Sequence, residues 1–207
     1  MKEYVTALEE SSGEYVEKHS KFLGFLIPCK SEEEAIAAIN AKRKEFWDAR
    51  HAVYAFILKD GTTRFSDDGE PHGTAGKPVL DILKSSGLKN ALIVVVRYFG
   101  GILLGTGGLV RAYSAAATAA LGACRKTRVT EGDRYSVSVA YGDYDKLMFV
   151  LKEAGAQILS ADFTDTVDLS FSISSERSDT CLRRIEDAFS SSVLPKNEGK
   201  TEIFEKI

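Results

Sequence analysis

Apolar positions in the first two thirds of the chain come in short runs that have the length of β-strands. The runs at 22–28, 52–58 and 91–96 are six or seven residues long, and turn-forming residues bound them. The segment 14–18 alternates and is expected to form a strand pair with 22–28. The run 91–96 contains no polar residue and several β-branched ones, which predicts a strand covered on both faces.

Helical spacing of apolar residues separates these strands. A capping box at 31–34, with Ser at its start and Glu at its end, begins a predicted helix that continues to Trp47. A second helix is predicted to run through Pro78, which a first turn tolerates, to Ser86. A third helix is predicted over 109–124, where small and apolar residues line one face.

The pattern restarts after a polar segment at 130–133. It predicts the order βαββαβ, a ferredoxin-like arrangement, and the expected fold class is therefore α+β. We expect two domains, at 1–130 and 133–207. The six predicted elements of the second domain are a strand at 135–141, a helix at 143–154, strands at 157–163 and 167–174, a helix at 178–189 and a short strand at 201–207.

The charges are divided unequally between the two predicted domains. The chain of 207 residues has a net charge of −3, but residues 1–132 hold 18 Lys and Arg against 16 Asp and Glu. Residues 133–207 hold 9 basic and 14 acidic residues. An electrostatic contact with nucleic acid is therefore expected on the first domain, although neither part is basic enough to bind nucleic acid by overall charge alone.

Cysteine usage and hydropathy indicate a cytoplasmic protein. Cys29, Cys124 and Cys181 are odd in number and scattered, which favours reduced thiols over a disulfide framework. The sequence contains no Cys-x-x-Cys pair, so a structural zinc site of the usual spacing is not predicted. The N-terminus shows no apolar signal segment, and the apolar runs are too short to span a bilayer, so no membrane partner is expected.

An acidic loop contains the first candidate chemistry. Asp67, Asp68 and Glu70 lie within four residues, and His72 follows them. Clustered carboxylates favour a divalent cation or a general acid and base. Asp-Asp-Gly and Glu-Pro are also ordinary turn sequences, in which carboxylates accept backbone N–H groups, and this interpretation is favoured. No metal or cofactor is predicted, and an enzyme is the less favoured class.

Five glycines before the third helix form a second candidate site. A helix N-terminus after a buried strand presents free N–H groups, and glycine lets an anion approach them. The segment matches neither common nucleotide-binding motif. Tight turns and close packing explain the glycines equally well. These residues are Gly100, Gly101, Gly105, Gly107 and Gly108.

Four basic residues near these loops are candidates for contacts with an anion. Arg97 directly follows the apolar strand 91–96, and Arg111 lies in the third helix. Together with Arg64 and Lys77 they would form an anion-binding face. Scattered surface charges more often do no more than interact with solvent.

Two segments resemble those that characterise the YigZ/IMPACT family. They are residues 65–78, Phe-Ser-Asp-Asp-Gly-Glu-Pro-His-Gly-Thr-Ala-Gly-Lys-Pro, and residues 95–113, which include Arg97-Tyr98-Phe99-Gly100-Gly101. Ala49-Arg50-His51 is similar to a further family position. The resemblance implies a first domain like the second domain of a small-subunit ribosomal protein and a ferredoxin-like second domain. Eukaryotic members regulate translation, and some bacterial members carry a proline-dipeptidase label.

Three functional hypotheses follow. The leading one is a non-enzymatic, translation-associated protein whose first domain contacts the ribosome or RNA. In it, Lys77, Arg97 and Arg111 bind phosphates. The second is a small-ligand or metal-dependent enzyme that uses Asp67, Asp68 and Glu70, although the sequence offers no dinuclear ligand set for a dipeptidase. The third is a protein–protein adaptor.

Overall fold

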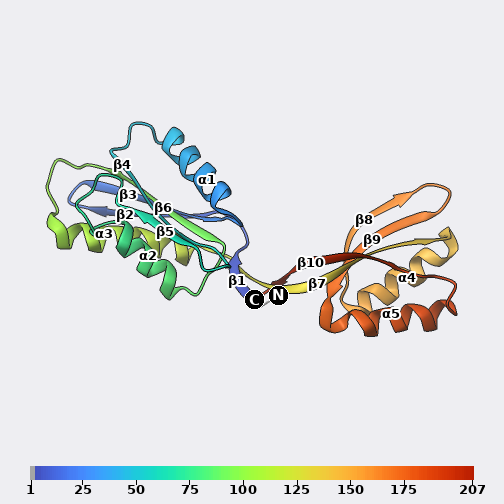
Figure 1. The fold of residues 1–207 in the computed structure, drawn as a ribbon. Helices are drawn as coiled ribbons and strands as arrows, with labels where there is room; N and C mark the ends of the chain where they lie inside the picture. The colour runs from blue at the N-terminus through green and yellow to red at the C-terminus, as the bar shows by residue number, and fades with distance from the viewer. Residues whose placement is uncertain (1–2) are drawn as a thin grey trace. The chain divides into compact units, whose positions relative to one another are not determined.

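The computed structural model describes residues 3–207, which form two compact units with separate sheets (Figure 1). Residues 4–128 make up nearly all of the first domain, and residues 129–205 make up nearly all of the second. Both domains combine an antiparallel sheet with helices, so the predicted α+β class is confirmed.

A five-stranded antiparallel sheet forms the centre of the first domain, in the order β2-β3-β6-β4-β5. Residues of β6 alternate between two cores: Ile93 and Val95 face one, whereas Leu92 and Val94 face the other. This is the double coverage that the apolar run predicted. The strands are β2 (Ser11–Glu17), β3 (Ser20–Pro28), β4 (His51–Ile57), β5 (Thr63–Ser66) and β6 (Ala91–Tyr98).

Three helices cover the two faces of this sheet. Helix α1 (Glu32–Glu45) covers one face, and α2 (Gly76–Ser85) and α3 (Gly105–Gly122) cover the other. Helix α3 lies so close to β3 that a Cβ on Gly24 would be 2.4 Å from the carbonyl oxygen of Ala116. The small residues of α3 therefore let it pack directly on the sheet.

Boundaries in the first domain differ from the predicted ones where glycines or short elements occur. Helix α3 begins at Gly105, one turn before the predicted start at Leu109. The start was predicted too late because residues that disfavour a helix occupy the first turn. Strand β5, of four residues, was not predicted. Helix α3 ends at Gly122, two residues before the predicted end at Cys124, and β7 begins at Lys126.

The second domain has the strand order β10-β7-β9-β8, which is the ferredoxin-like order. Helices α4 and α5 pack on one face of the sheet, around Leu147, Phe171 and Ile185. Strand β1 (Tyr4–Ala7) belongs to the first domain and pairs with β7, the strand inside which the two units divide. The elements are β7 (Lys126–Val139), α4 (Tyr141–Ala154), β8 (Gln157–Phe163), β9 (Val167–Ser174), α5 (Ser175–Phe189) and β10 (Lys196–Lys206).

The first and last strands of this domain are longer than predicted. Strand β7 begins nine residues before Tyr135, and β10 begins five residues before Thr201. The early part of each strand is polar, so it lacks the apolar alternation from which strands are predicted. The hairpin of β8 and β9 has the predicted bounds.

Candidate functional site

Asp67 caps helix α2. Its Oδ1 accepts hydrogen bonds from the backbone N–H groups of Ala75 (3.1 Å) and Gly76 (2.8 Å), and its Oδ2 accepts one from Gly73 (2.9 Å). Burial opposes ionisation of this carboxyl, but the three N–H groups outweigh it and lower the pKa of Asp67. Ala75, the N-cap residue, has no side-chain oxygen, so Asp67 supplies the cap that α2 itself lacks.

Asp68 ties the acidic loop to the sheet. Its carboxylate accepts hydrogen bonds from the backbone N–H of Ala52 (2.7 Å) and from the side chain of Arg43. Its carbonyl oxygen lies 2.7 Å from Nδ1 of His51. Because a carbonyl oxygen only accepts, Nδ1 of His51 carries a proton.

Glu70 is buried and belongs to a charged network. Its Oε1 accepts hydrogen bonds from Nη1 of Arg97 (2.6 Å) and from the hydroxyl of Tyr113 (2.7 Å). Nε2 of His51 lies 3.7 Å from the same oxygen. Burial and then the charge of Glu70 raise the pKa of Tyr113. The three carboxylates of the loop therefore have separate partners.

This arrangement favours the turn interpretation of the acidic loop over the metal interpretation. His72, the fourth predicted member, is fully exposed and lies 3.7 Å from Asp67. No three His, Cys, Asp or Glu side chains within residues 3–207 whose placement is described converge as a metal site would require.

A cavity of about 340 Å³ opens where β6, the acidic loop and α3 meet. Register explains part of its wall, since His51 on β4 pairs with Arg97 on β6. Helix α3 begins at its rim, with no side-chain cap at Leu104 and no acidic residue in the first turn. The lining residues are Arg50, His51, Gly69, Glu70, Pro71, Arg97, Phe99, Leu103, Leu104, Gly105, Thr106 and Leu109.

The cavity wall has positive electrostatic character. The 18-residue helix α3 places the positive end of its dipole and its free N–H groups at the rim. Arg50 is exposed and forms no ion pair with a carboxylate in the described part of the chain. Nη1 of Arg97 binds Glu70, but its Nε is buried without any hydrogen-bond partner.

Four of the five glycines of the second candidate site occupy positions that require glycine, for different reasons. A Cβ on Gly100 would lie 2.1 Å from the backbone of His19, and one on Gly108 would lie 2.9 Å from Leu104. Gly101 and Gly105 have φ values of +83° and +70°, which strain other residues. Packing or backbone conformation thus accounts for these four.

Gly107 is the exception. It is exposed in the first turn of α3, its φ lies outside the left-handed range, and a Cβ there would meet only the tip of Arg111 at 3.6 Å. Nothing in its packing requires glycine, although alanine favours a helix more strongly. Gly107 lies outside the cavity lining but in the first turn of α3, where its lack of a side chain leaves the adjacent backbone N–H groups uncovered.

The predicted basic residues do not form one surface. Arg97 lines the cavity, but it is buried and paired. Arg64 pairs with Glu32, and Lys77 pairs with Asp81. Arg111 is exposed on α3 and outside the cavity lining.

Several cavity residues were not predicted as site residues, among them Arg50, His51, Phe99 and Leu103. The position of Arg50 and His51 at the start of β4 gave them no role from spacing alone. The signal that could have found them is the Ala49-Arg50-His51 segment in the family resemblance.

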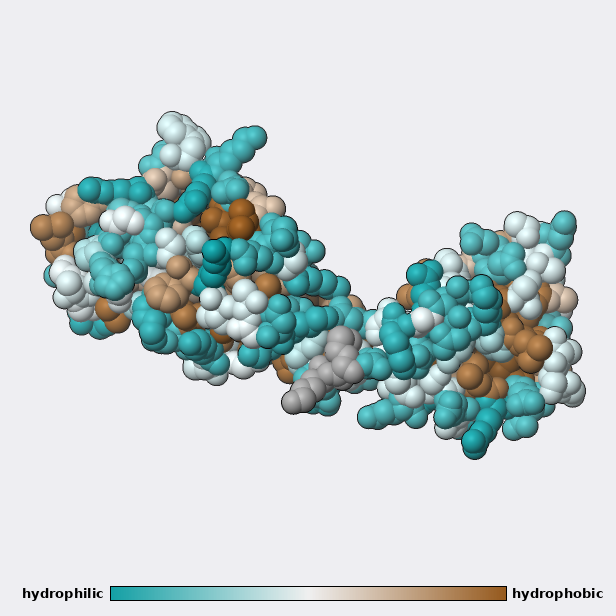
Figure 2. Space-filling model, viewed as in Figure 1, coloured by the Kyte–Doolittle hydropathy of each residue, from teal (hydrophilic) through white to brown (hydrophobic). Residues whose placement is uncertain are grey.

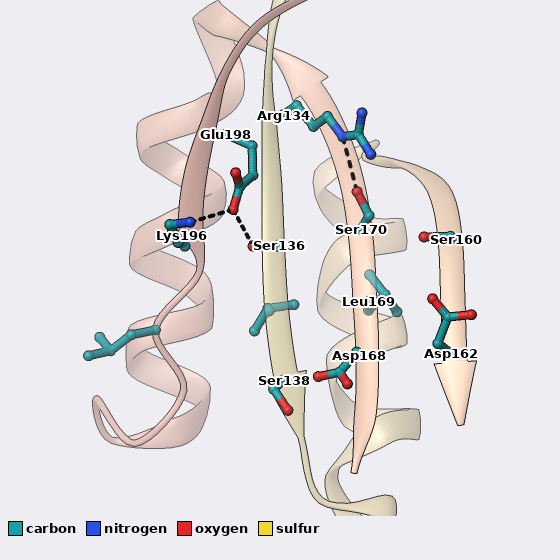
Figure 3. A pocket seen from close by; sticks show the side chains of 12 residues that line it. Arg134, Ser136, Ser138, Ser160, Asp162, Asp168, Leu169, Ser170, Lys196 and Glu198 are labelled. Atoms are coloured by element: carbon teal, nitrogen blue, oxygen red, sulfur yellow. Dashed lines mark hydrogen bonds and ion pairs between the residues drawn. The ribbon is translucent and has the colours of Figure 1, made fainter. Parts of the chain in front are cut away.

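A larger hollow of about 700 Å³ lies on the open face of the second-domain sheet (Figure 3). Serines from three strands line it, including Ser136, Ser160 and Ser170. Several of its polar side chains have partners: Glu198 accepts from Ser136 at 2.8 Å and pairs with Lys196 at 3.1 Å, and Nε of Arg134 donates to Ser170. We favour the smaller first-domain cavity as the functional site, because it combines the exposed Arg50, which has no ion-pair partner in the described chain, with the uncapped N-terminus of α3.

An apolar groove lies between α4 and α5, on the other side of this domain's sheet. Figure 2 shows a hydrophobic patch on the second domain over these helices. Phe149, Val150 and Ala188 line the groove, and Phe149 is exposed. Such a patch is suited to contact with another macromolecule.

The thiols provide no nucleophile. All three cysteines are free, and burial raises the pKa of Cys29 to about 12 and that of Cys181 to about 11. Burial also raises the pKa of Cys124, and a protonated thiol is a poor nucleophile. The described helices include none with the length and hydropathy needed to cross a membrane.

These features define a two-domain α+β protein with an IMPACT-type first domain. Residues 18–121 match the Impact N-terminal domain, and residues 137–192 match a domain of unknown function, DUF1949. The chain belongs to the IMPACT family, which confirms the resemblance seen in the sequence.

Bacterial relatives match over most of the chain. IMPACT family member YigZ of Escherichia coli (strain K12) is 39% identical over 163 residues, which are 77% of each protein. An IMPACT family member of Haemophilus influenzae is 36% identical over 187 residues, covering 88% of this chain and 87% of the relative. A crystal structure of an hypothetical protein aligns with a TM-score of 0.64 and 32% identity, covering 94% of this chain and 97% of that one.

Proposed function

We propose that this chain is a non-enzymatic binding protein of the translation apparatus and that its first domain contacts phosphate groups of RNA. The observation that carries this proposal is the uncapped N-terminus of α3, which opens onto a cavity containing Arg50, His51 and Arg97. A helix N-terminus with adjacent guanidinium groups favours phosphate. Membership of the IMPACT family supports the link to translation, which the family resemblance implies.

The charge of the domain limits how many phosphates can be bound. The 18 basic residues of the first 132 are nearly balanced by 16 acidic ones, and several of the basic residues form ion pairs. Binding therefore depends on a few local contacts, and its salt dependence should be shallow compared with that of a basic nucleic-acid-binding domain. Arg50 and Arg111 are the exposed candidates for these contacts.

Association with ribosomes and with RNA oligonucleotides, measured across a salt series, tests the proposal. Arg50→Ala and Arg111→Ala should each reduce the log–log slope by about 0.7 to 0.9, the value for one lost phosphate contact. Arg64→Ala is the matched control, because Arg64 is exposed but already paired with Glu32. Folded Arg50 and Arg111 variants that bind as well as wild type at every salt concentration would refute the proposal.

A protein–protein adaptor is the second candidate function. The exposed apolar groove at Phe149 favours it, because a solvated apolar patch gains free energy when a partner covers it. Phe149→Ser should leave RNA binding unchanged if the first domain carries that activity. Loss of ribosome association in Phe149→Ser, with RNA binding intact, would favour the adaptor.

A further inference from the structure

We propose that the first-domain cavity binds one unpaired nucleotide of a single-stranded RNA, with the phosphate on its cationic wall and the base on its apolar wall. This inference rests on the proposed function and specifies the form of RNA that the site accepts. It follows from the two chemically different walls of the cavity.

The cationic wall offers unused donors to a phosphate. Arg97 lies in this wall, more than nine-tenths buried and paired with Glu70; its Nε has no hydrogen-bond partner but is itself closed to solvent. Arg50 adds a charge without an ion-pair partner in the described chain. The first N–H groups of α3 lie beside them, and at Gly107 no side chain covers the backbone. The exposed donors of this wall are therefore the guanidinium of Arg50 and the first N–H groups of α3, which an anionic ligand would satisfy.

The apolar wall exposes side chains to which a base could bind. Leu103 is 83% exposed, and Phe99 is exposed in part. The ring of Phe99 lies 5.9 Å from the guanidinium carbon of Arg50 and 5.7 Å from that of Arg97. Exposed aromatic and guanidinium planes are the groups on which unpaired bases stack.

A duplex suits this cavity poorly. In a double helix the faces of the bases are stacked on one another, so they cannot reach Phe99 or Leu103. Proteins that bind duplex RNA contact phosphates across a wide surface, whereas Arg50 is the exposed basic residue among those that line this cavity. A volume of about 340 Å³ is at the small end of ligand pockets, which suits one nucleotide.

The test measures fluorescence anisotropy of a labelled single-stranded 12-residue RNA and of the same strand annealed to its complement, with the full chain. We expect the single strand to bind roughly 10-fold tighter or more. Phe99→Ala and Leu103→Ala should weaken single-strand binding, by roughly 5-fold or more for Phe99, and leave the salt slope unchanged. Trp47→Ala is the matched control, because Trp47 is 82% exposed in the same domain but outside the cavity lining.

The outcomes separate this inference from the proposed function. Equal binding of single strand and duplex, or folded Phe99 and Leu103 variants that bind like wild type, would overturn the inference while RNA binding stands. Absence of binding by either RNA, and by ribosomes, would overturn both. Binding of a labelled peptide that ends in phenylalanine, with no binding of either RNA, would assign the cavity to a protein partner and overturn the inference.

Discussion

Arg97 and Glu70 form an ion pair that is nearly closed to solvent: Nη1 lies 2.6 Å from Oε1, and the two side chains are 7% and 4% exposed. Arg97 comes from the end of β6, and Glu70 comes from the loop between β5 and α2. The pair thus connects the acidic loop to the sheet beneath the cavity. Tyr113 of α3 donates to the same carboxylate oxygen, so three segments meet at Glu70.

Removal of either partner should destabilise the first domain strongly. Glu70→Ala or Arg97→Ala should cost about 3–5 kcal/mol, because each leaves an uncompensated buried charge. The double substitution Glu70→Leu with Arg97→Met should cost much less than the sum, as urea unfolding would measure. Arg64→Ala, at an exposed pair, should cost at most about 1 kcal/mol. Additive effects of the two buried substitutions would contradict the coupling.

Stability should depend on the ionisation of Asp67. The pKa of this carboxyl in the folded protein lies below its unfolded value of about 3.9, so its contribution is fully present above that value and is lost as pH falls further. Asp67→Asn should cost about 1–2 kcal/mol at pH 7, because one carboxylate acceptor is replaced by an amide donor. The difference from wild type should shrink below about pH 4.

Thermal unfolding across pH 2–7 measures this effect. Asp81→Asn serves as the control, because Asp81 is exposed and pairs only with Lys77 on the surface of α2. A constant difference between wild type and Asp67→Asn across the acid range would show that the negative charge does not stabilise the cap.

Gly107→Ala should raise stability and weaken binding. Nothing in the packing opposes a methyl group there, so the substitution should stabilise the domain by about 0.4–1 kcal/mol. The same methyl group would hinder a ligand at the N–H groups of α3, and we expect about 5-fold weaker RNA binding, equivalent to one lost hydrogen bond. Gly122→Ala is the matched control, because Gly122 lies in the last turn of the same helix with nothing within 4 Å. Equal RNA binding by both variants would remove Gly107 from the site.

The independent folding of the two domains remains a prediction. Each has its own apolar core, and the compact units divide between Arg128 and Val129, inside β7. Fragment 1–128 should unfold cooperatively, whereas fragment 129–207 should be of marginal stability because of its small size. Calorimetry of both fragments and of the full chain measures this. A single transition of the full chain that neither fragment reproduces would contradict the prediction.

No dipeptidase activity is expected. A two-metal hydrolase holds its ions ~4 Å apart with several shared ligands, whereas Asp67, Asp68 and Glu70 accept hydrogen bonds from separate groups. Protein incubated with Mn²⁺ or Zn²⁺ should hydrolyse Xaa-Pro dipeptides no faster than a metal blank. Turnover that disappears in Asp68→Asn would reverse this conclusion and favour an enzyme.

The pattern of the sequence was sufficient for the elements whose signal is local. The run 91–96 predicted a strand buried on both faces, and β6 has that environment. The predicted capping box is confirmed: Oγ of Ser31 accepts a hydrogen bond from the backbone N–H of Glu34. The start of α3 was not, because its first turn contains three glycines that resemble a loop.

By itself, then, the sequence determined the fold class, the ferredoxin-like order of the second domain and the family, because periodicity and contiguous motifs carry that information. Tertiary structure alone decided which side chains meet. Glu70 and Arg97 are 27 residues apart, and His51 lies opposite Arg97 only because β4 pairs with β6 in that register. Burial turned Arg97 from a predicted surface contact into part of a buried pair, and no local pattern encodes that partner.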